Sequence, residues 1–189
     1  MKIIKTLLLC VALFGITACS STYSLEEGKY ITSQSNEGYK KKTIKKKTDL
    51  SQFRKLLYFE TNMVNSEYRA KFLERLRNIK FFQRVHDDRY IDTSVYEETN
   101  IYPVKDKNIR KAYLDAQYSD YLILEVIVKK TGSYEYEINM TAKTNKSDDL
   151  LFVYKDKQKL FVTTINDALF NKSLNTFSDW VTSLEHGSI

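Results

Sequence analysis

Side chains that most readily carry out catalysis or bind metal ions are sparse in this chain of 189 residues. Only two histidines are present, His86 and His186. His86 is followed by Asp87 and Asp88. Together with Glu60, this triplet could supply metal ligands or a general base, but the spacing matches neither a zinc site nor an EF-hand loop. We therefore interpret it as polar loop residues after a strand, and predict no catalytic residue, no metal site and no cofactor.

Recurrent catalytic motifs are also missing from the sequence. Neither a Gly-rich phosphate loop nor a G-x-S-x-G elbow nor a dinucleotide fingerprint occurs, and the chain has only five glycines. Glycoside hydrolysis by two carboxylates needs residues from distant segments to converge, which a sequence does not reveal. A hydrolase that acts through carboxylates such as Glu60 and Asp87 therefore stays open as an alternative.

Cys19 is the residue whose chemistry its neighbours define best. The segment Met1–Lys5 carries two lysines, Leu7–Phe14 is almost wholly apolar, and Ile16–Ala18 leads into the cysteine. This is the layout of a removable secretory signal. The apolar stretch is shorter than the roughly 20 residues of a membrane span. We predict that residues 1–18 are a signal peptide and that the mature chain begins at Cys19.

The run Ile16–Cys19 resembles the lipobox of bacterial lipoproteins. In that family the cysteine receives a diacylglycerol on its thiol, becomes the new N-terminus and is usually acylated again on its amine. Ser20 follows, where an aspartate tends to retain such proteins in the inner membrane. The resemblance therefore implies anchoring to the outer membrane through acyl chains on Cys19, and we predict a protein that faces the periplasm. Cys10 leaves with the signal peptide, so no internal disulfide is expected.

Residues 19–48 have the composition of a mostly disordered, lipidated tether, rich in Ser, Thr, Gly, Asn and Lys. One stretch of the tether holds six lysines: Lys40, Lys41, Lys42, Lys45, Lys46 and Lys47. They could lie on anionic head groups or acidic cell-wall polymers, or form a solvated, self-repelling spacer. The net charge of +6 arises before residue 49, because 21 of the 30 basic and 21 of the 24 acidic side chains lie from there on. We therefore expect no nucleic-acid partner.

The pattern of residues 49–189 predicts a single domain of the α/β class. Its first half predicts a strand at 53–59, a helix after Ser66, a short strand at 81–85 and a loop over 86–105. The helix follows from the apolar set Tyr68, Phe72, Leu76 and Ile79.

The second half predicts a helix from Asp106 to about Tyr118, then a strongly apolar strand at 121–128 and an alternating strand at 134–142. Thr131–Ser133 favours a hairpin between the two strands. Another hairpin is expected around Asp156, and the apolar stripe from Phe170 to Leu184 indicates a closing helix with a capping-box-like start at Thr164 and Asp167. Together these elements predict a mixed, largely antiparallel sheet with about three helices packed on its faces.

Two stretches resemble a family of envelope lipoproteins that includes the penicillin-binding-protein activator and the curli secretion lipoprotein. Leu73–Asp87 resembles the family's step from a helix through a short turn with phenylalanine into a strand. Ala116–Val128 resembles its second step, from a helix into a hydrophobic strand. This sequence lacks the glycine that often interrupts the strand in that family, and it has Glu125 in that neighbourhood. The resemblance implies the fold and the compartment rather than an activity.

Three tyrosines of the predicted 86–105 loop, Tyr90, Tyr96 and Tyr102, are candidates for a partner surface, or for a lid over the sheet. The sequence thus predicts an outer-membrane lipoprotein that acts as a non-enzymatic binding or accessory module, with an envelope protein or peptidoglycan as partner. A lipid-anchored cell-wall or glycan hydrolase and a transport accessory that binds a small ligand are the alternatives.

Overall fold

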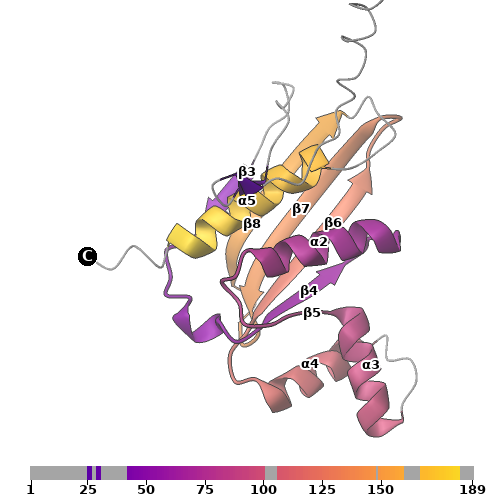
Figure 1. Ribbon diagram of the computed structural model, residues 1–189, viewed down its shortest axis with the longest axis vertical. Helices are drawn as coiled ribbons and strands as arrows, with labels where there is room; N and C mark the ends of the chain where they lie inside the picture. The colour runs from indigo at the N-terminus through magenta and orange to yellow at the C-terminus, as the bar shows by residue number, and fades with distance from the viewer. Residues whose placement is uncertain are drawn as a thin grey trace, which may run out of the picture.

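The computed structural model describes residues 25–26, 29–30, 42–100, 106–147, 149–159 and 167–183. A six-stranded sheet forms the centre of this part, in the order β3-β8-β7-β6-β4-β5 (Figure 1). Its strands are β3 (Lys42–Lys45), β4 (Leu57–Thr61), β5 (Val85–Asp87), β6 (Leu122–Lys130), β7 (Glu135–Thr144) and β8 (Leu150–Lys159). β4 is parallel to β5 and β6, and the other neighbouring strands are antiparallel. Two further strands, β1 (Leu25–Glu26) and β2 (Lys29–Tyr30), pair with each other.

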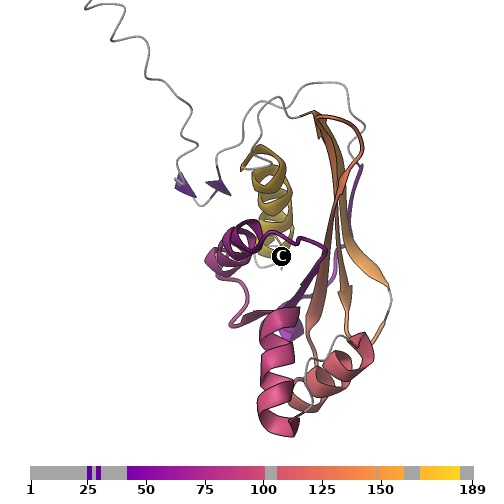
Figure 2. The ribbon, with the colours of Figure 1, turned by 90° about the vertical axis from the view of Figure 1, so that its right-hand side faces the viewer.

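The helices of the described part divide between the two sides of the sheet. They are α2 (Ser66–Asn78), α3 (Asp88–Thr99), α4 (Lys107–Gln117) and α5 (Asp167–Ser183), with a short 3-10 helix, η1 (Ser51–Phe53). Figure 2 shows α2 and α5 along one face, and α3 and α4 at one end of the sheet. Among the described elements, no helix covers the rest of the opposite face. The predicted mixed α/β architecture is confirmed, with one α-helix more than expected.

The face under α2 and α5 holds the larger hydrophobic core. Alternate residues of the strands point into it, and the aromatic rings of α5 close over them. The Phe177 ring lies 5.3 Å from that of Phe152 and 5.7 Å from that of Trp180, and all three side chains are buried. Fully burying an apolar side chain of this size contributes about 1.5–3 kcal/mol, so this layer carries much of the stability.

A smaller core fixes α3 and α4 to the other side of the sheet. Tyr58 follows Leu57 on β4 and therefore points to the opposite face. The residues of this cluster, all buried, are Leu56, Tyr58, Ile91, Val95, Leu114 and Tyr121. Leu114 thereby holds α4 beside β4.

The structure confirms the helix predicted after Ser66, the helix predicted from Asp106, the hairpin at Thr131–Ser133 and the alternating strand at 134–142. Asn65 caps α2, because its side-chain oxygen accepts hydrogen bonds from two amides of the first turn. Asp106 caps α4 by accepting a hydrogen bond from the Asn108 amide at 2.7 Å. The hairpin at Thr131–Ser133 joins β6 and β7. Along β7, Ile138 is buried as its alternation predicts.

The predicted loop over residues 86–105 is wrong for its first part, which forms α3. Asp87 caps this helix by accepting a hydrogen bond from the Tyr90 amide at 3.0 Å, and Asn100 ends it in the left-handed conformation with φ 58°. Only Ile91 and Val95 are buried along α3. A stripe of two residues is too short for the periodicity to stand out in the sequence.

The predicted hairpin around Asp156 is also wrong, because β8 is one continuous strand through that residue. The buried Asp156 carboxylate accepts a hydrogen bond from the Tyr154 hydroxyl at 2.9 Å and lies 3.4 Å from the Lys172 ammonium of α5. These partners allow a carboxylate inside a strand, where the sequence alone suggests a turn. Thr164, the expected cap of the last helix, lies outside the described residues.

The lysine-rich tether was expected to end at residue 48, but β3 lies within it and forms the edge of the sheet. Ile44 is the register partner of Val153 on β8, and the Lys46 carbonyl accepts a hydrogen bond from the Trp180 indole at 3.1 Å. The folded domain therefore starts no later than Lys42. None of the helices within the described ranges has the length and apolarity needed to cross a membrane.

Candidate functional site

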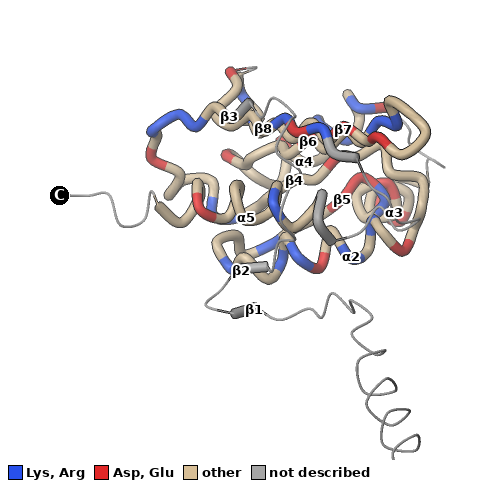
Figure 3. The backbone as a smooth tube through the Cα atoms, turned by 90° about the horizontal axis from the view of Figure 1, so that it is seen from above, with Lys and Arg blue, Asp and Glu red and all other residues tan. Residues whose placement is uncertain are grey.

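The face of the sheet opposite α2 and α5 presents side chains of mixed polarity. One row crosses five strands in register, from β3 to β4, and consists of Ile44, Val153, Thr141, Glu125 and Glu60. We call this side of the sheet the open face. Figure 3 shows basic and acidic residues interspersed along the described chain, rather than gathered on one element.

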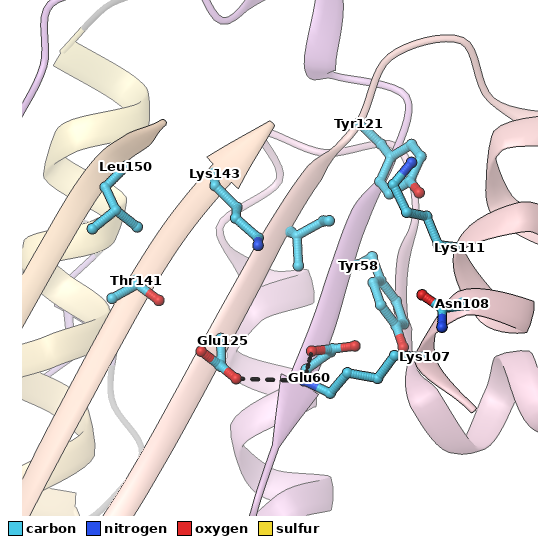
Figure 4. Close-up of a pocket in the computed structure, with 11 residues that line it drawn as sticks. Tyr58, Glu60, Lys107, Asn108, Lys111, Tyr121, Glu125, Thr141, Lys143 and Leu150 are labelled. Atoms are coloured by element: carbon cyan, nitrogen blue, oxygen red, sulfur yellow. Dashed lines mark hydrogen bonds and ion pairs between the residues drawn. The ribbon is translucent and has the colours of Figure 1, made fainter. Parts of the chain in front are cut away.

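A groove of about 380 Å³ lies where the open face meets the start of α4 (Figure 4). Strands β4, β6, β7 and β8 form its floor, and α4 forms one wall. Its lining residues are Tyr58, Glu60, Lys107, Asn108, Lys111, Tyr121, Ile123, Glu125, Thr141, Lys143 and Leu150. This volume lies within the range of about 300–1,000 Å³ typical of small-molecule sites.

Three charged groups meet in the groove. Glu60 and Glu125 are register partners on adjacent parallel strands, so their carboxylates lie side by side. The Lys107 ammonium lies 2.8 Å from a Glu60 oxygen and 3.6 Å from a Glu125 oxygen. The hydrogen bond to Glu60 raises the pKa of Lys107. The lysine is therefore charged at neutral pH, and it neutralises part of the repulsion between the two carboxylates.

Two tyrosines form the deep part of the groove. Tyr121 is fully buried, and its hydroxyl donates a hydrogen bond to Asp115 at 3.0 Å. Tyr58 is only 3% exposed, and its hydroxyl forms no hydrogen bond of good geometry with any described residue. Burial, and next the Glu60 carboxylate, raise the pKa of Tyr58. Both hydroxyls therefore stay protonated at neutral pH.

The position of α4 depends on ion pairs beneath the groove. Arg110 of α4 forms a two-pronged interaction with Asp92 of α3, at 2.6 and 2.7 Å. At the start of α3, Asp87 accepts a hydrogen bond from the Nε of Arg69 on α2 at 2.8 Å, and Asp88 also pairs with Arg69. Paired carboxylates and guanidinium groups of this geometry fix the orientation of the helices that carry them. They join α4 to α3 and α3 to α2, and the Lys107–Glu60 pair joins the start of α4 to β4.

Within the described residues, His86, Asp87 and Asp88 all contact neighbouring groups that stabilise the fold. The His86 ring stacks on Tyr90 with centroids 4.0 Å apart, and burial, followed by Arg84 and Arg77, lowers its pKa. The two following aspartates serve the start of α3 and its ion pairs. No group of three or more histidine, cysteine or acidic side chains within the described segments could hold a metal ion.

The carboxylates of Glu60 and Asp87 do not converge. Asp87 is the register partner of Phe59, whose side chain lies in the core under α2 and α5. Glu60 follows Phe59 and points to the open face. The two groups are therefore on opposite sides of the sheet. Only 16% of the Glu60 side chain is exposed.

Two of the candidate tyrosines are exposed on α3 rather than on a loop: Tyr90 is 50% exposed and Tyr96 is 41% exposed. Positions six apart on an α-helix lie about 120° apart around its axis. These two rings therefore do not form one continuous patch. Tyr102 lies outside the described residues.

The other predicted positions fall on the N-terminal part of the chain. Cys19, Lys40 and Lys41 lie outside the described residues. Lys42 and Lys45 belong to β3, and the exposed Lys46 and Lys47 follow it.

Sequence reasoning missed the residues that α4 and β7 contribute to the groove, above all Lys107 and Lys143. One signal was available: Glu125 interrupts an otherwise apolar strand. A carboxylate in such a strand requires a partner or a solvated face. The identity of that partner depends on the parallel pairing of β4 with β6 and on the packing of α4, which the sequence does not display.

Comparison with known proteins identifies neither a matching family model nor a matching curated protein. Solved structures with similar backbones include a single-substitution variant of the PelC dodecamer from Paraburkholderia phytofirmans, at 5% identity and a TM-score of 0.47, covering 76% of this chain and 98% of that one. Lipoprotein GNA1162 from Neisseria meningitidis is 12% identical, with a TM-score of 0.42, covering 72% of this chain and 99% of that one. Likenesses at this level carry no inference about function.

Proposed function

We propose that this chain is a lipoprotein of the outer membrane, anchored through Cys19, whose domain binds an envelope protein or the cell wall without catalysing a reaction. The anchor is supported by the signal-like start and by the lipobox resemblance at Ile16–Cys19. The domain's role is supported by one observation above all: helices bury one face of the sheet, and no helix of the described residues covers most of the other face, which ends in a groove. Concave surfaces with a few convergent polar groups are typical of binding sites.

Binding is favoured over hydrolysis because the available carboxylates are engaged. Asp87 caps α3 and accepts a hydrogen bond from Arg69 on the covered side of the sheet. Glu60 and Glu125 do share the groove, but both pair with the Lys107 ammonium. A glycosidase needs one carboxyl group that gives its proton to a substrate oxygen, whereas two carboxylates around an ammonium favour binding of a cation. The volume of the groove supports a second candidate function, a transport accessory that binds a small ligand.

The anchor is tested by Cys19→Ala in cells that carry the full chain. We expect the variant to fold normally but to leave the membrane fraction, because the acyl chains are lost. Fractionation followed by immunoblotting measures this, with Cys10→Ala as the matched control, since Cys10 lies in the predicted signal peptide. A Cys19→Ala protein that stays firmly membrane-bound would contradict the lipid anchor.

Binding and hydrolysis are separated by incubating the purified full chain with cell-wall material. Retention of the protein without release of soluble fragments is the expected result for a binding module. Turnover that Glu60→Gln abolishes would instead establish the hydrolase.

A further inference from the structure

The paired carboxylates of the groove need a cation between them. Glu60 and Glu125 lie directly opposite each other on neighbouring strands, and like charges in this arrangement destabilise a sheet. Only 16% of the Glu60 side chain is exposed, so water provides limited compensation. Lys107 supplies the positive charge from α4.

The position of Lys107 is unfavourable for α4 itself. It is the first residue of the helix, immediately after the cap Asp106. The N-terminus of a helix carries a partial positive charge and disfavours a lysine there. Its side chain is 67% exposed, so it can move away without disturbing the core. The Lys107 ammonium can therefore leave the two carboxylates, which stay in place on their strands.

The floor of the groove adds the hydroxyl of Tyr58, which lies near Glu60 and Arg110. The Tyr58 hydroxyl is buried and forms no hydrogen bond of good geometry with a described residue. Buried polar atoms are nearly always paired. Figure 4 shows this hydroxyl directed toward the Lys107 end of the groove. A primary ammonium carries three donors, and Glu60, Glu125 and Tyr58 together offer three acceptors.

We infer that the groove binds a primary amine carried on a hydrocarbon body, and that Lys107 occupies the amine position until such a ligand displaces it. Ile123, Leu150 and the Tyr121 ring line the groove where the hydrocarbon body lies. This inference rests on the proposed binding function and names the chemical class of its ligand. The amine belongs either to a small free molecule or to a peptide of the cell wall.

The test uses the full chain in a non-ionic detergent, titrated with n-butylammonium, which reproduces the end of a lysine side chain. Lys107→Ala is expected to bind this probe about tenfold more tightly than the native chain, because a tethered group competes at an effective concentration in the millimolar range. Protein NMR shifts of residues around the groove measure the affinity. Uncharged n-butanol is expected to produce no comparable shifts.

Two variants control for charge and position. Lys71→Ala removes a lysine of α2 that lies outside the groove and pairs with Glu67, and it is expected to bind the probe like the native chain. Adding Glu125→Gln to Lys107→Ala is expected to reverse the gain in affinity. If Lys107→Ala binds the probe no better than Lys71→Ala, or if Glu125→Gln has no effect, the amine site is refuted. Should Lys107→Ala fail to fold, the native chain and Glu125→Gln are compared at higher probe concentrations. Equal affinity of these two proteins for n-butylammonium would then refute the amine site.

A second arm identifies the source of the amine. Soluble cell-wall peptides are titrated with their amines free or acetylated. Binding of the free form alone assigns the site to the cell wall, whereas binding of n-butylammonium without binding of either peptide assigns it to a small free amine. Failure of the broader proposed function is distinguishable, because it is measured by retention on cell-wall material and by capture in cells rather than by this titration.

Discussion

The two faces of the sheet differ in what covers them and in which residues they carry. The covered face, under α2 and α5, contains an almost continuous layer of aromatic and aliphatic side chains. The open face carries Glu60, Glu125 and Lys143 around a groove, with Ile123 between them. Alternation along the same strands produces both surfaces. Stability is therefore concentrated on one side of each strand, which leaves the other side available for recognition.

The largest expected effect comes from the covered face. Phe177→Ala removes a fully buried ring that contacts Phe152 and Trp180, and should lower the free energy of unfolding by about 3–5 kcal/mol. Thr141→Ala on the open face should change it by no more than about 0.5 kcal/mol. Urea unfolding followed by circular dichroism measures both. Similar losses from the two variants would remove the distinction between the faces.

A smaller effect is expected at His86, which is the register partner of Tyr58 on the β4–β5 side. Burial, Arg84 and Arg77 lower the pKa of this histidine below its ordinary value of 6.5. The folded chain therefore binds the proton less readily than the unfolded chain, and the stability that His86 contributes above that ordinary value is lost as the pH falls through the lowered pKa.

His86→Phe keeps a ring that stacks on Tyr90 but removes the titrating group. The loss of unfolding free energy between about pH 7.5 and about pH 5 should be smaller in this variant than in the native chain. Urea unfolding at the two pH values measures the difference. An unchanged pH dependence would mean that His86 titrates alike in the folded and unfolded chain.

The smallest effect is expected from an ion pair of the open face. The Lys155 ammonium lies 3.2 Å from a Glu137 oxygen, and 48% of the lysine side chain is exposed. Lys155→Ala should change the free energy of unfolding by about 0.5 kcal/mol or less. Added salt should reduce this difference further, since exposed charges are screened. A loss as large as that of Phe177→Ala would show that the open face also carries the fold.

Local patterns predicted the elements whose signal is complete within a short segment. The stripe of α2, the start of α4 near Asp106 and the alternation of β7 are examples, because each depends on residues a few positions apart. α3 escaped prediction because its buried stripe has only two members. β8 was divided at Asp156 because the lysine that pairs with that carboxylate comes from a distant helix.

The sequence predicted only some of the residues that form the groove. Glu60 and Glu125 were noticed separately, the first as a candidate carboxylate and the second as an exception in an apolar strand. Their proximity arises from the parallel pairing of β4 with β6, across more than sixty positions of sequence. Lys107 joins them through tertiary packing of α4, for which no local pattern exists. Charge pairs of this kind arise from the pairing of strands and the packing of helices, so the spacing of residues along the sequence does not reveal them.

The claim that the open face is the recognition surface is tested most directly by site-specific crosslinking in intact cells. A photo-reactive residue is placed at Thr141, which lines the groove, or at Ala70, which is exposed on α2 over the covered face. The account predicts that the Thr141 position captures one dominant envelope protein or cell-wall component, and that the Ala70 position does not. Two results would contradict the account. In one, the Ala70 position captures that component and the Thr141 position does not; in the other, both positions capture only the same unspecific mixture of proteins.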